Sequence, residues 1–229
     1  MKFGKLADIS GIAFTLPPVN DRTLDRLGRK PANDFQAFVG LPRWSSKDWI
    51  GQLFPKGTKQ NEYLHYYARS FNTIELNTTH YRIPKPDQIE KWAAQVPSTF
   101  VFCPKIPQVI SHYRKLIHSD SEIEEFTDSI RHFSSKLGCS FIQMHESFGP
   151  NLMNNLENFL QKWPSDLPIA FEFRHQEWFE AQQLFPALID LLTEHKVATV
   201  ITDVSGRRDV FHTDLSNRAA MIRLVGNAM

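Results

Sequence analysis

Short apolar, β-branched or aromatic segments alternate with segments of helical spacing from about residue 37 onward, and this alternation constrains the fold most strongly. The predicted strands recur at intervals of about 25 to 35 residues, and predicted helices separate most of them. Strands that alternate with helices are typical of repeated βα units, which build parallel sheets. We predict seven strands, at residues 37–44, 72–81, 99–107, 139–145, 168–178, 197–206 and 219–226, and five helices, at residues 60–71, 85–96, 119–138, 151–163 and 181–196.

Both a doubly wound sheet and a (β/α)₈ barrel fit this order, and two features favour the barrel. The first strand is followed by "VGLPRW" rather than by a glycine-rich phosphate loop, and polar residues recur where the later strands end. We therefore predict an α/β fold of the TIM-barrel type over residues 37–229, after an irregular lead-in at 1–36 with one short helix near 22–27. The sequence stops just after the seventh strand, so we expect the eighth strand to be missing or irregular.

Composition excludes several classes of protein. Apolar residues make up 41% and charged residues 22%, as in an ordinary globular domain and unlike a disordered chain, and 18 phenylalanines predict an aromatic core. The net charge of +1 gives no general basic excess for nucleic-acid binding, although a local basic cleft fits a balanced total. The N-terminus lacks a signal-peptide core, and no run is long enough to span a membrane. Two cysteines in apolar runs favour free thiols, so we expect a cytoplasmic protein without a membrane partner.

Polar residues interrupt the predicted strands near their C-terminal ends. The stretch "PIAFEFRHQEW" places Glu172 and Arg174 on one face, since residues two apart on a strand share a face. Charged residues are almost never buried unless they are paired, so this pair predicts a site. The same pattern selects Glu75, Asn77, Lys105, Gln143, Asp203 and Arg223. In a barrel these side chains would meet at one mouth.

Plainer interpretations stay open for each residue. A charge at a strand end can be a solvated edge residue, Asp203 can open a turn, and Lys105 can extend to solvent from between two prolines. Glu172 and Arg174 can form a structural ion pair, although such pairs stabilise little. No spacing fits a zinc motif, so we predict no metal site, although a scattered site stays open at His80, His112, His145 and His175 near strand ends. No serine elbow is present. Aromatic residues beside basic ones in "HYYARSF" are better explained as a core face than as nucleic-acid contacts.

Six blocks together resemble a known family. They are "FVGLPRWSSKDWIGQLFP", "LHYYARSFNTIELNTTHYRIPKPDQIEKW", "FVFCPKIPQVISHYRKL", "LGCSFIQMHESFG", "IAFEFRHQEW" and "AMIRLVG". They follow one another in the order found in domain-of-unknown-function family 72, the YecE-like family, over residues 38–226. The resemblance implies a TIM-type barrel and little about activity. Its pattern selects Glu75, Asn77, Tyr81, Lys105, His112, Gln143, Glu172, Arg174, Trp178 and Arg223.

The chain departs from the family pattern at three places. Val225 stands where a histidine usually follows the "RL" pair, and His145 stands where a proline is usual. The aromatic-rich eighth strand that ends in asparagines is absent from the sequence. The first departure removes a candidate proton carrier, and the third predicts self-association or a need for a partner segment, because an open barrel exposes strand edges.

These residues predict an enzyme that acts on a small anionic or phosphorylated polyhydroxy substrate, as an isomerase, lyase or hydrolase. Glu75, Lys105 and Glu172 are the candidate catalytic residues, for acid/base chemistry or, at Lys105, a Schiff base. The candidate substrate-binding residues are Asn77, Tyr81, His112, Gln143, Arg174, Trp178, Asp203 and Arg223. The residues identify no cofactor. The alternative is a barrel that binds an anion or a nucleic acid without turnover.

Overall fold

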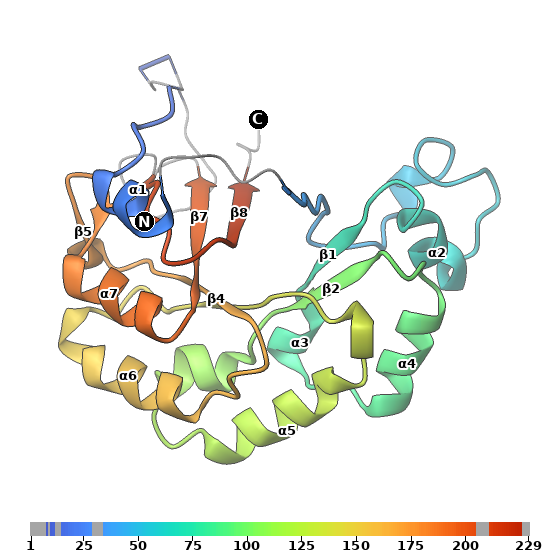
Figure 1. Ribbon diagram of the computed structural model, residues 1–229. Coiled ribbons are helices and arrows are strands. Elements are labelled where there is room, and N and C mark those ends of the chain that lie inside the picture. The colour runs from blue at the N-terminus through green and yellow to red at the C-terminus, as the bar shows by residue number, and fades with distance from the viewer. Residues whose placement is uncertain (1–7, 9, 12–14, 29–33, 205–210, 226–229) are drawn as a thin grey trace. The chain divides into compact units, whose positions relative to one another are not determined.

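The computed structural model describes residues 8, 10–11, 15–28, 34–204 and 211–225. Within them the chain is an α/β protein with parallel sheets, and it divides into two compact units (Figure 1). Unit 1 comprises residues Met1–Ala32 and Ile142–Met229, and unit 2 comprises Asn33–Phe141. Each unit is described by itself.

Unit 2 is built on two short parallel strands, β1 (Thr73–Leu76) and β2 (Val101–Pro104). Helix α4 (Pro86–Ala94) begins with proline at its first position, where a missing N–H is tolerated, and α5 (Asp120–Arg131) buries one apolar face. The other segments are the helices α2 (Tyr63–Tyr67) and α3 (Thr78–Tyr81), the 3₁₀ turns η1 (Lys47–Trp49), η2 (Gln60–Glu62) and η4 (Ser134–Lys136), and the π-helical turn η3 (Val109–Tyr113).

The predicted strand at 37–44 is wrong, although this segment does run beside β1. The backbone N–H groups of Asn72 and Glu75 donate to the carbonyls of Val39 and Leu41. In the other direction, the N–H of Val39 donates to the Asn72 side chain and that of Leu41 donates to the Tyr67 hydroxyl. Because these two N–H groups donate to side chains, and because the next residue, Pro42, has no N–H, a regular ladder does not form. The segment is therefore extended but is not a strand.

Unit 1 contains a parallel sheet with the strand order β3-β4-β7-β8. Its register pairs Phe171 with Thr199 and Thr202 with Arg223. The strands are β3 (Ser140–Gln143), whose first two residues belong to unit 2, β4 (Ile169–Glu172), β7 (Ala198–Val204) and β8 (Ala220–Val225), with a small antiparallel hairpin of β5 (Phe179–Glu180) and β6 (Gln183–Leu184). The helices are α1 (Asp21–Leu27), α6 (Met153–Lys162) and α7 (Pro186–Glu194), with the turns η5 (Pro150–Leu152) and η6 (Gln176–Trp178).

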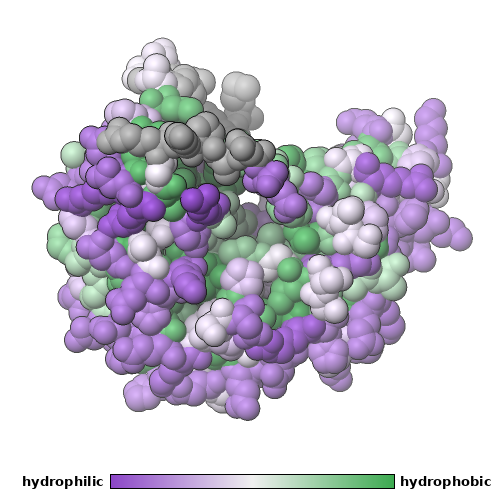
Figure 2. Space-filling model, viewed as in Figure 1, coloured by the Kyte–Doolittle hydropathy of each residue, from purple (hydrophilic) through white to green (hydrophobic). Residues whose placement is uncertain are grey.

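Outside residues 37–44, each predicted strand and helix overlaps an element of the same type, although several are shorter than expected. The aromatic core is confirmed, since nine phenylalanines are almost completely buried: Phe54, Phe100, Phe102, Phe126, Phe133, Phe141, Phe148, Phe159 and Phe171. Both cysteines are free thiols, and burial raises the pKa of each. Figure 2 shows mainly hydrophilic residues on the viewed face, with hydrophobic ones between them. Among the described residues, no helix is both long and apolar enough to cross a membrane.

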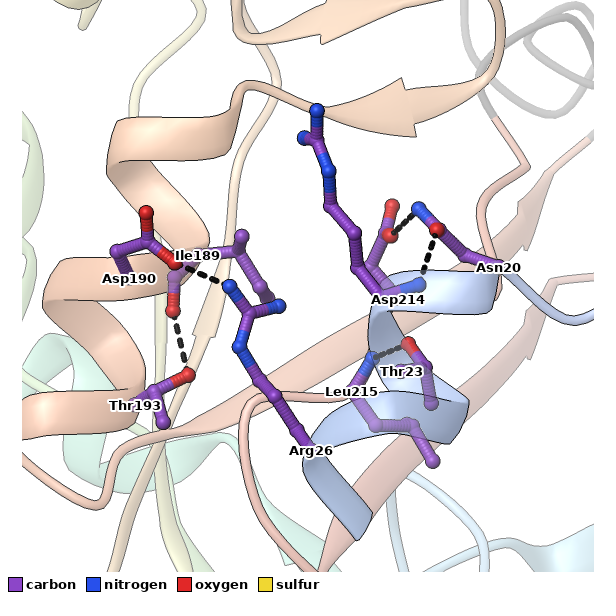
Figure 3. Close-up of polar contacts among 9 residues, drawn as sticks. Asn20, Thr23, Arg26, Ile189, Asp190, Thr193, Asp214 and Leu215 are labelled. Carbon is purple, nitrogen blue, oxygen red and sulfur yellow. Dashed lines mark hydrogen bonds and ion pairs between the residues drawn. The ribbon is translucent and has the colours of Figure 1, made fainter. Parts of the chain in front are cut away.

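Helix α1, which confirms the short helix expected in the lead-in, packs on the C-terminal part of unit 1 (Figure 3). The Asn20 side chain caps the helix by accepting from the N–H of Arg22, and it also donates to the buried Asp214 carboxylate at 2.5 Å. Asp214 accepts a second hydrogen bond from the N–H of Leu184. The hydroxyl of Thr23 accepts from the N–H of Leu215 at 3.1 Å. The remaining residues of 1–36 lie partly outside the described part of the chain.

Replacing Asn20 with alanine is expected to destabilise unit 1 by about 1–3 kcal/mol. The change removes a helix cap and one of the donors to a buried carboxylate. Urea denaturation with matched m-values measures the loss. Asn20→Ser is the control, because serine can restore the cap but is too short to replace the contact with Asp214. A loss below about 0.5 kcal/mol would show that α1 contributes little to the stability of this unit.

Candidate functional site

A buried carboxylate lies at the C-terminal end of β4. Glu172 is 5% exposed, and its Oε2 accepts a short ion-paired hydrogen bond from the guanidinium of Arg223. Its Oε1 accepts from Nε2 of Gln143 at 2.7 Å. The three side chains come from β4, β8 and β3, and all belong to unit 1. We call these three residues the Glu172 cluster.

The sheet explains why these residues meet. Parallel strands place their C-terminal ends at the same edge, and Gln143 and Glu172 are the last residues of β3 and β4. Arg223 lies on β8, separated from β4 by β7, and its long side chain reaches across β7 to the carboxylate. All four residues of β4 are buried, so the charge on Glu172 needs this cation and this amide as partners.

The register divides the polar residues of β7 between two faces. Thr202 pairs with Arg223, and Asp203 pairs with Leu224. Paired residues on neighbouring strands point to the same face and successive residues to opposite faces, so Thr202 shares the face of Arg223 while Asp203 points to the other. The Thr202 hydroxyl is buried and has no hydrogen-bond partner within the described part of the chain. This places an unsatisfied polar group on the face of the Glu172 cluster.

The other two candidates of unit 1 differ in burial. Arg174 lies two residues beyond the end of β4 and is partly buried. Trp178 lies in η6 and is fully buried, with its ring against Phe148 and Phe173. Its indole N–H donates to the carbonyl of Phe148 at 2.5 Å. Trp178 is therefore part of the core of unit 1.

In unit 2, the carboxylate of Glu75 and the amide of Asn77 are in contact. Nδ2 of Asn77 donates to Oε1 of Glu75 at 3.0 Å, and Asn77 immediately precedes α3. Lys105 follows β2 and is 8% exposed, and its Nζ lies 5.7 Å from the centre of the Phe141 ring. The backbone of Lys105 donates to the carbonyl of Leu76, which continues the β1–β2 pairing. These three candidates therefore lie at or just beyond the ends of two paired strands.

Two further candidates of unit 2 lie near a histidine that the strand pattern did not select. Tyr81 is 73% exposed at the end of α3, and His112 lies in η3 with its Nδ1 at 2.8 Å from the Ser111 hydroxyl. The buried His80 places its ring 5.1 Å from that of His112 and 5.2 Å from that of Tyr81. Desolvation by burial lowers the pKa of His80, and the charge of Lys105 adds to the effect.

Sequence reasoning missed Thr202 and considered His80 only as a metal ligand, not as a substrate-site residue. Both stand directly beside selected positions, since Thr202 precedes Asp203 and His80 precedes Tyr81. A strand face assigned from the register would have found Thr202. Among the described residues, no group of three or more His, Cys, Asp or Glu side chains is arranged to hold a metal ion.

The fold resembles that of solved structures. A DUF72 family protein from Thermotoga maritima MSB8 superposes with a TM-score of 0.69 at 24% identity, over 83% of this chain and 74% of that one. A DUF72 family protein from Enterococcus faecalis V583 gives a TM-score of 0.68 at 23% identity, over 83% of this chain and 70% of that one. At this identity the likeness shows the fold alone.

Similarity in sequence extends to curated proteins. The UPF0759 protein YecE of Escherichia coli K12 is 32% identical over 166 residues, which are 72% of this chain and 58% of YecE. The UPF0759 protein YunF of Bacillus subtilis 168 is 30% identical over 154 residues, which are 62% of this chain and 52% of YunF. The chain thus spans little more than half the length of these relatives. Residues 38–229 match the family described as "Protein of unknown function DUF72", and the chain belongs to that family.

Proposed function

We propose that the protein is an enzyme that binds a small anionic or phosphorylated polyhydroxy substrate and acts on it by general acid/base chemistry. The supporting observation is the Glu172 cluster, in which a carboxylate 5% exposed is held by a guanidinium and an amide at the end of a parallel strand. A buried ion pair is a poor source of stability, because desolvation offsets most of the attraction. A contribution to stability therefore does not explain the cluster, whereas binding a ligand and acting on it does.

The proposal includes a β/α-barrel type of fold. Strands alternate with helices along the chain, and the pairs β1–β2, β4–β7 and β7–β8 are all parallel. Barrels of this type bind their ligands at the C-terminal ends of the strands. Gln143 and Glu172 stand at such ends.

Each residue has a proposed role that follows from its chemistry. Arg174 and Arg223 bind the phosphate or carboxylate of the substrate, because planar guanidinium groups match oxyanions. Glu172 fixes the guanidinium of Arg223 and accepts a proton or hydrogen bond from a substrate hydroxyl, which Gln143 orients. Within unit 2, Glu75, whose carboxylate accepts from Asn77, and Lys105 are proposed as acid/base groups in their own right.

Binding without turnover is the second candidate function, with an anion or a nucleic acid as the ligand. Both oxygens of Glu172 already accept hydrogen bonds, one from Gln143 and one from Arg223. This leaves the carboxylate fewer lone pairs for proton transfer than an unpaired base has. An affinity that falls steeply with salt would identify a polyanionic ligand.

Thermal-shift measurements against sugar phosphates, nucleotides and small carboxylates test the proposal. A ligand at about 100 times its Kd stabilises the native state by about 2.7 kcal/mol, which raises the melting temperature by several degrees. We expect such a shift in the wild type and a clearly smaller one in Arg174→Ala. The matched control is Arg218→Ala, which removes an exposed arginine of unit 1 outside the strands. An equal shift in both variants would contradict the role of Arg174, and no shift with any compound would favour a large partner.

A further inference from the structure

A cleft of about 510 Å³ is lined by residues of unit 2 alone, and no residue of the Glu172 cluster lines it. It is bordered by the loop that follows α3, by η3 and by α5, and α5 packs against η3. The volume lies in the range of sites for small molecules. The lining residues that carry the argument are His80, Tyr81, Arg82, Lys85, Tyr113 and Glu125.

The rim of the cleft carries two exposed cations. Arg82 and Lys85 follow the buried His80 by two and five residues, and they make no ion pair with any residue that the structure describes. The nearby acid Glu122 has its own cation, since its Oε2 accepts from Arg114 at 2.8 Å. Two cations with no internal partner suit an anionic ligand, and a phosphate can accept hydrogen bonds from both.

Two exposed aromatic rings border the same cleft. Tyr81 is 73% exposed and Tyr113 is 71% exposed, although large aromatic side chains are usually buried to a much greater extent. An exposed tyrosine offers a rigid, flat, apolar face against which a sugar ring or a base can pack. These rings therefore favour a ligand that carries a ring as well as an anionic group.

His80 gives the cleft a fixed hydrogen-bond acceptor. Its Nδ1 lies 2.7 Å from the carbonyl of Ile106, and because a carbonyl only accepts, Nδ1 carries the proton. In the neutral ring, Nε2 is then an acceptor, and burial favours this neutral form by lowering the pKa. Within the described part of the chain, no donor is bonded to Nε2. A ligand hydroxyl can fill this position.

We propose that this cleft binds a sugar phosphate, either free or as part of a nucleotide. Arg82 and Lys85 bind the phosphate, Tyr81 and Tyr113 pack against the ring, and His80 and Glu125 accept hydrogen bonds from hydroxyls. The inference goes beyond the proposed function, because it uses none of the residues of the Glu172 cluster.

Titration calorimetry of the full chain tests the proposal with glucose 6-phosphate and AMP as probes. Glucose, adenosine and inorganic phosphate are the controls, since each lacks either the phosphate or the ring. We expect at least one phosphorylated probe to bind with a submillimolar Kd and the controls to bind about tenfold or more weakly. Binding of glucose 6-phosphate would identify a free sugar phosphate as sufficient, and binding of AMP alone would identify a nucleotide.

Variants locate the binding in the cleft. Arg82→Ala and Lys85→Ala should each weaken it about tenfold or more, because each removes a charged donor to the phosphate. Tyr113→Ala should weaken it several-fold and Tyr113→Phe should retain it, since the ring face makes the contact. His80→Asn keeps a donor for the Ile106 carbonyl but has no acceptor at the position of Nε2, so it should weaken binding at an unchanged melting temperature. The matched control is Lys91→Ala, an exposed cation of α4 outside the cleft, which should leave the Kd unchanged.

Two outcomes would overturn the proposal. One is the absence of binding by both phosphorylated probes at about 10 mM, a concentration that detects very weak ligands. The other is binding that Arg82→Ala and Lys85→Ala leave intact and that Arg174→Ala abolishes, which would place the probe at the site proposed above for the substrate. Failure of the cleft and failure of the proposed function are thus separate results.

Discussion

Replacing Arg223 with methionine is expected to lower the free energy of unfolding of unit 1 by about 3–5 kcal/mol. The Glu172 side chain is 6% exposed and the Arg223 side chain is 14% exposed, so water cannot readily replace the lost cation. The amide of Gln143 remains as a donor to Oε1, but it carries no charge. Breaking a buried pair from one side costs far more than its net contribution, because an uncompensated charge stays behind. Urea denaturation followed by circular dichroism measures the change.

The double variant Glu172→Gln with Arg223→Met provides the control. It removes both charges at once, so we expect a smaller loss than that of Arg223→Met alone, with strongly non-additive free energies. A loss below about 1 kcal/mol for Arg223→Met would show that the carboxylate is hydrated or protonated in the folded chain. Glu172→Gln alone distinguishes a structural role of the cluster from a role in ligand binding. If the cluster is only structural, this variant changes stability and no ligand response.

Local sequence pattern was sufficient to predict the order of strands and helices. β7 and β8 were predicted from their β-branched and apolar residues, and α4 and α5 from their starts and apolar spacing. Residues 37–44 have a strand-like composition, yet the N–H groups of Val39 and Leu41 donate to side chains that lie 33 and 26 residues further along the chain, respectively. Composition cannot reveal that side chains take the place of a neighbouring strand as acceptors, because this depends on which distant residues lie beside the segment in the fold.

The sequence pattern selected the residues of the Glu172 cluster, but it did not predict which of them are in contact. Face alternation on one strand suggested that Glu172 and Arg174 belong together, and the structure instead pairs the carboxylate with Arg223, 51 residues along the chain. Which strands are neighbours decides this, and the order β4-β7-β8 was not visible in the sequence. The same limit applies to His80, because the carbonyl that fixes its ring comes from Ile106, beyond the next strand.

Burial distinguishes the predicted role of Trp178 from the role that the structure supports. The sequence predicted a substrate contact, whereas the indole is fully buried between two phenylalanine rings and donates to the carbonyl of Phe148. Trp178→Ala is expected to destabilise unit 1 by about 3–5 kcal/mol, because it leaves a large cavity and an unpaired carbonyl. Urea denaturation of the variant beside the wild type measures this loss.

Trp178→Phe is the matched control, because it keeps an aromatic ring and removes only the N–H and part of the volume. We expect it to cost about 1–2 kcal/mol, since the cavity is smaller while the carbonyl of Phe148 still loses its donor. A residue that contacts substrate gives a different result, in which ligand affinity falls while the urea midpoint is preserved. Trp178 is the last residue of η6, which directly follows the loop that carries Arg174, so a correctly packed indole also fixes where this loop ends. If the ligand response is lost in Trp178→Ala and retained in Trp178→Phe, Trp178 acts by positioning Arg174. If it is lost in both variants while stability is unchanged, the result would support the predicted substrate contact.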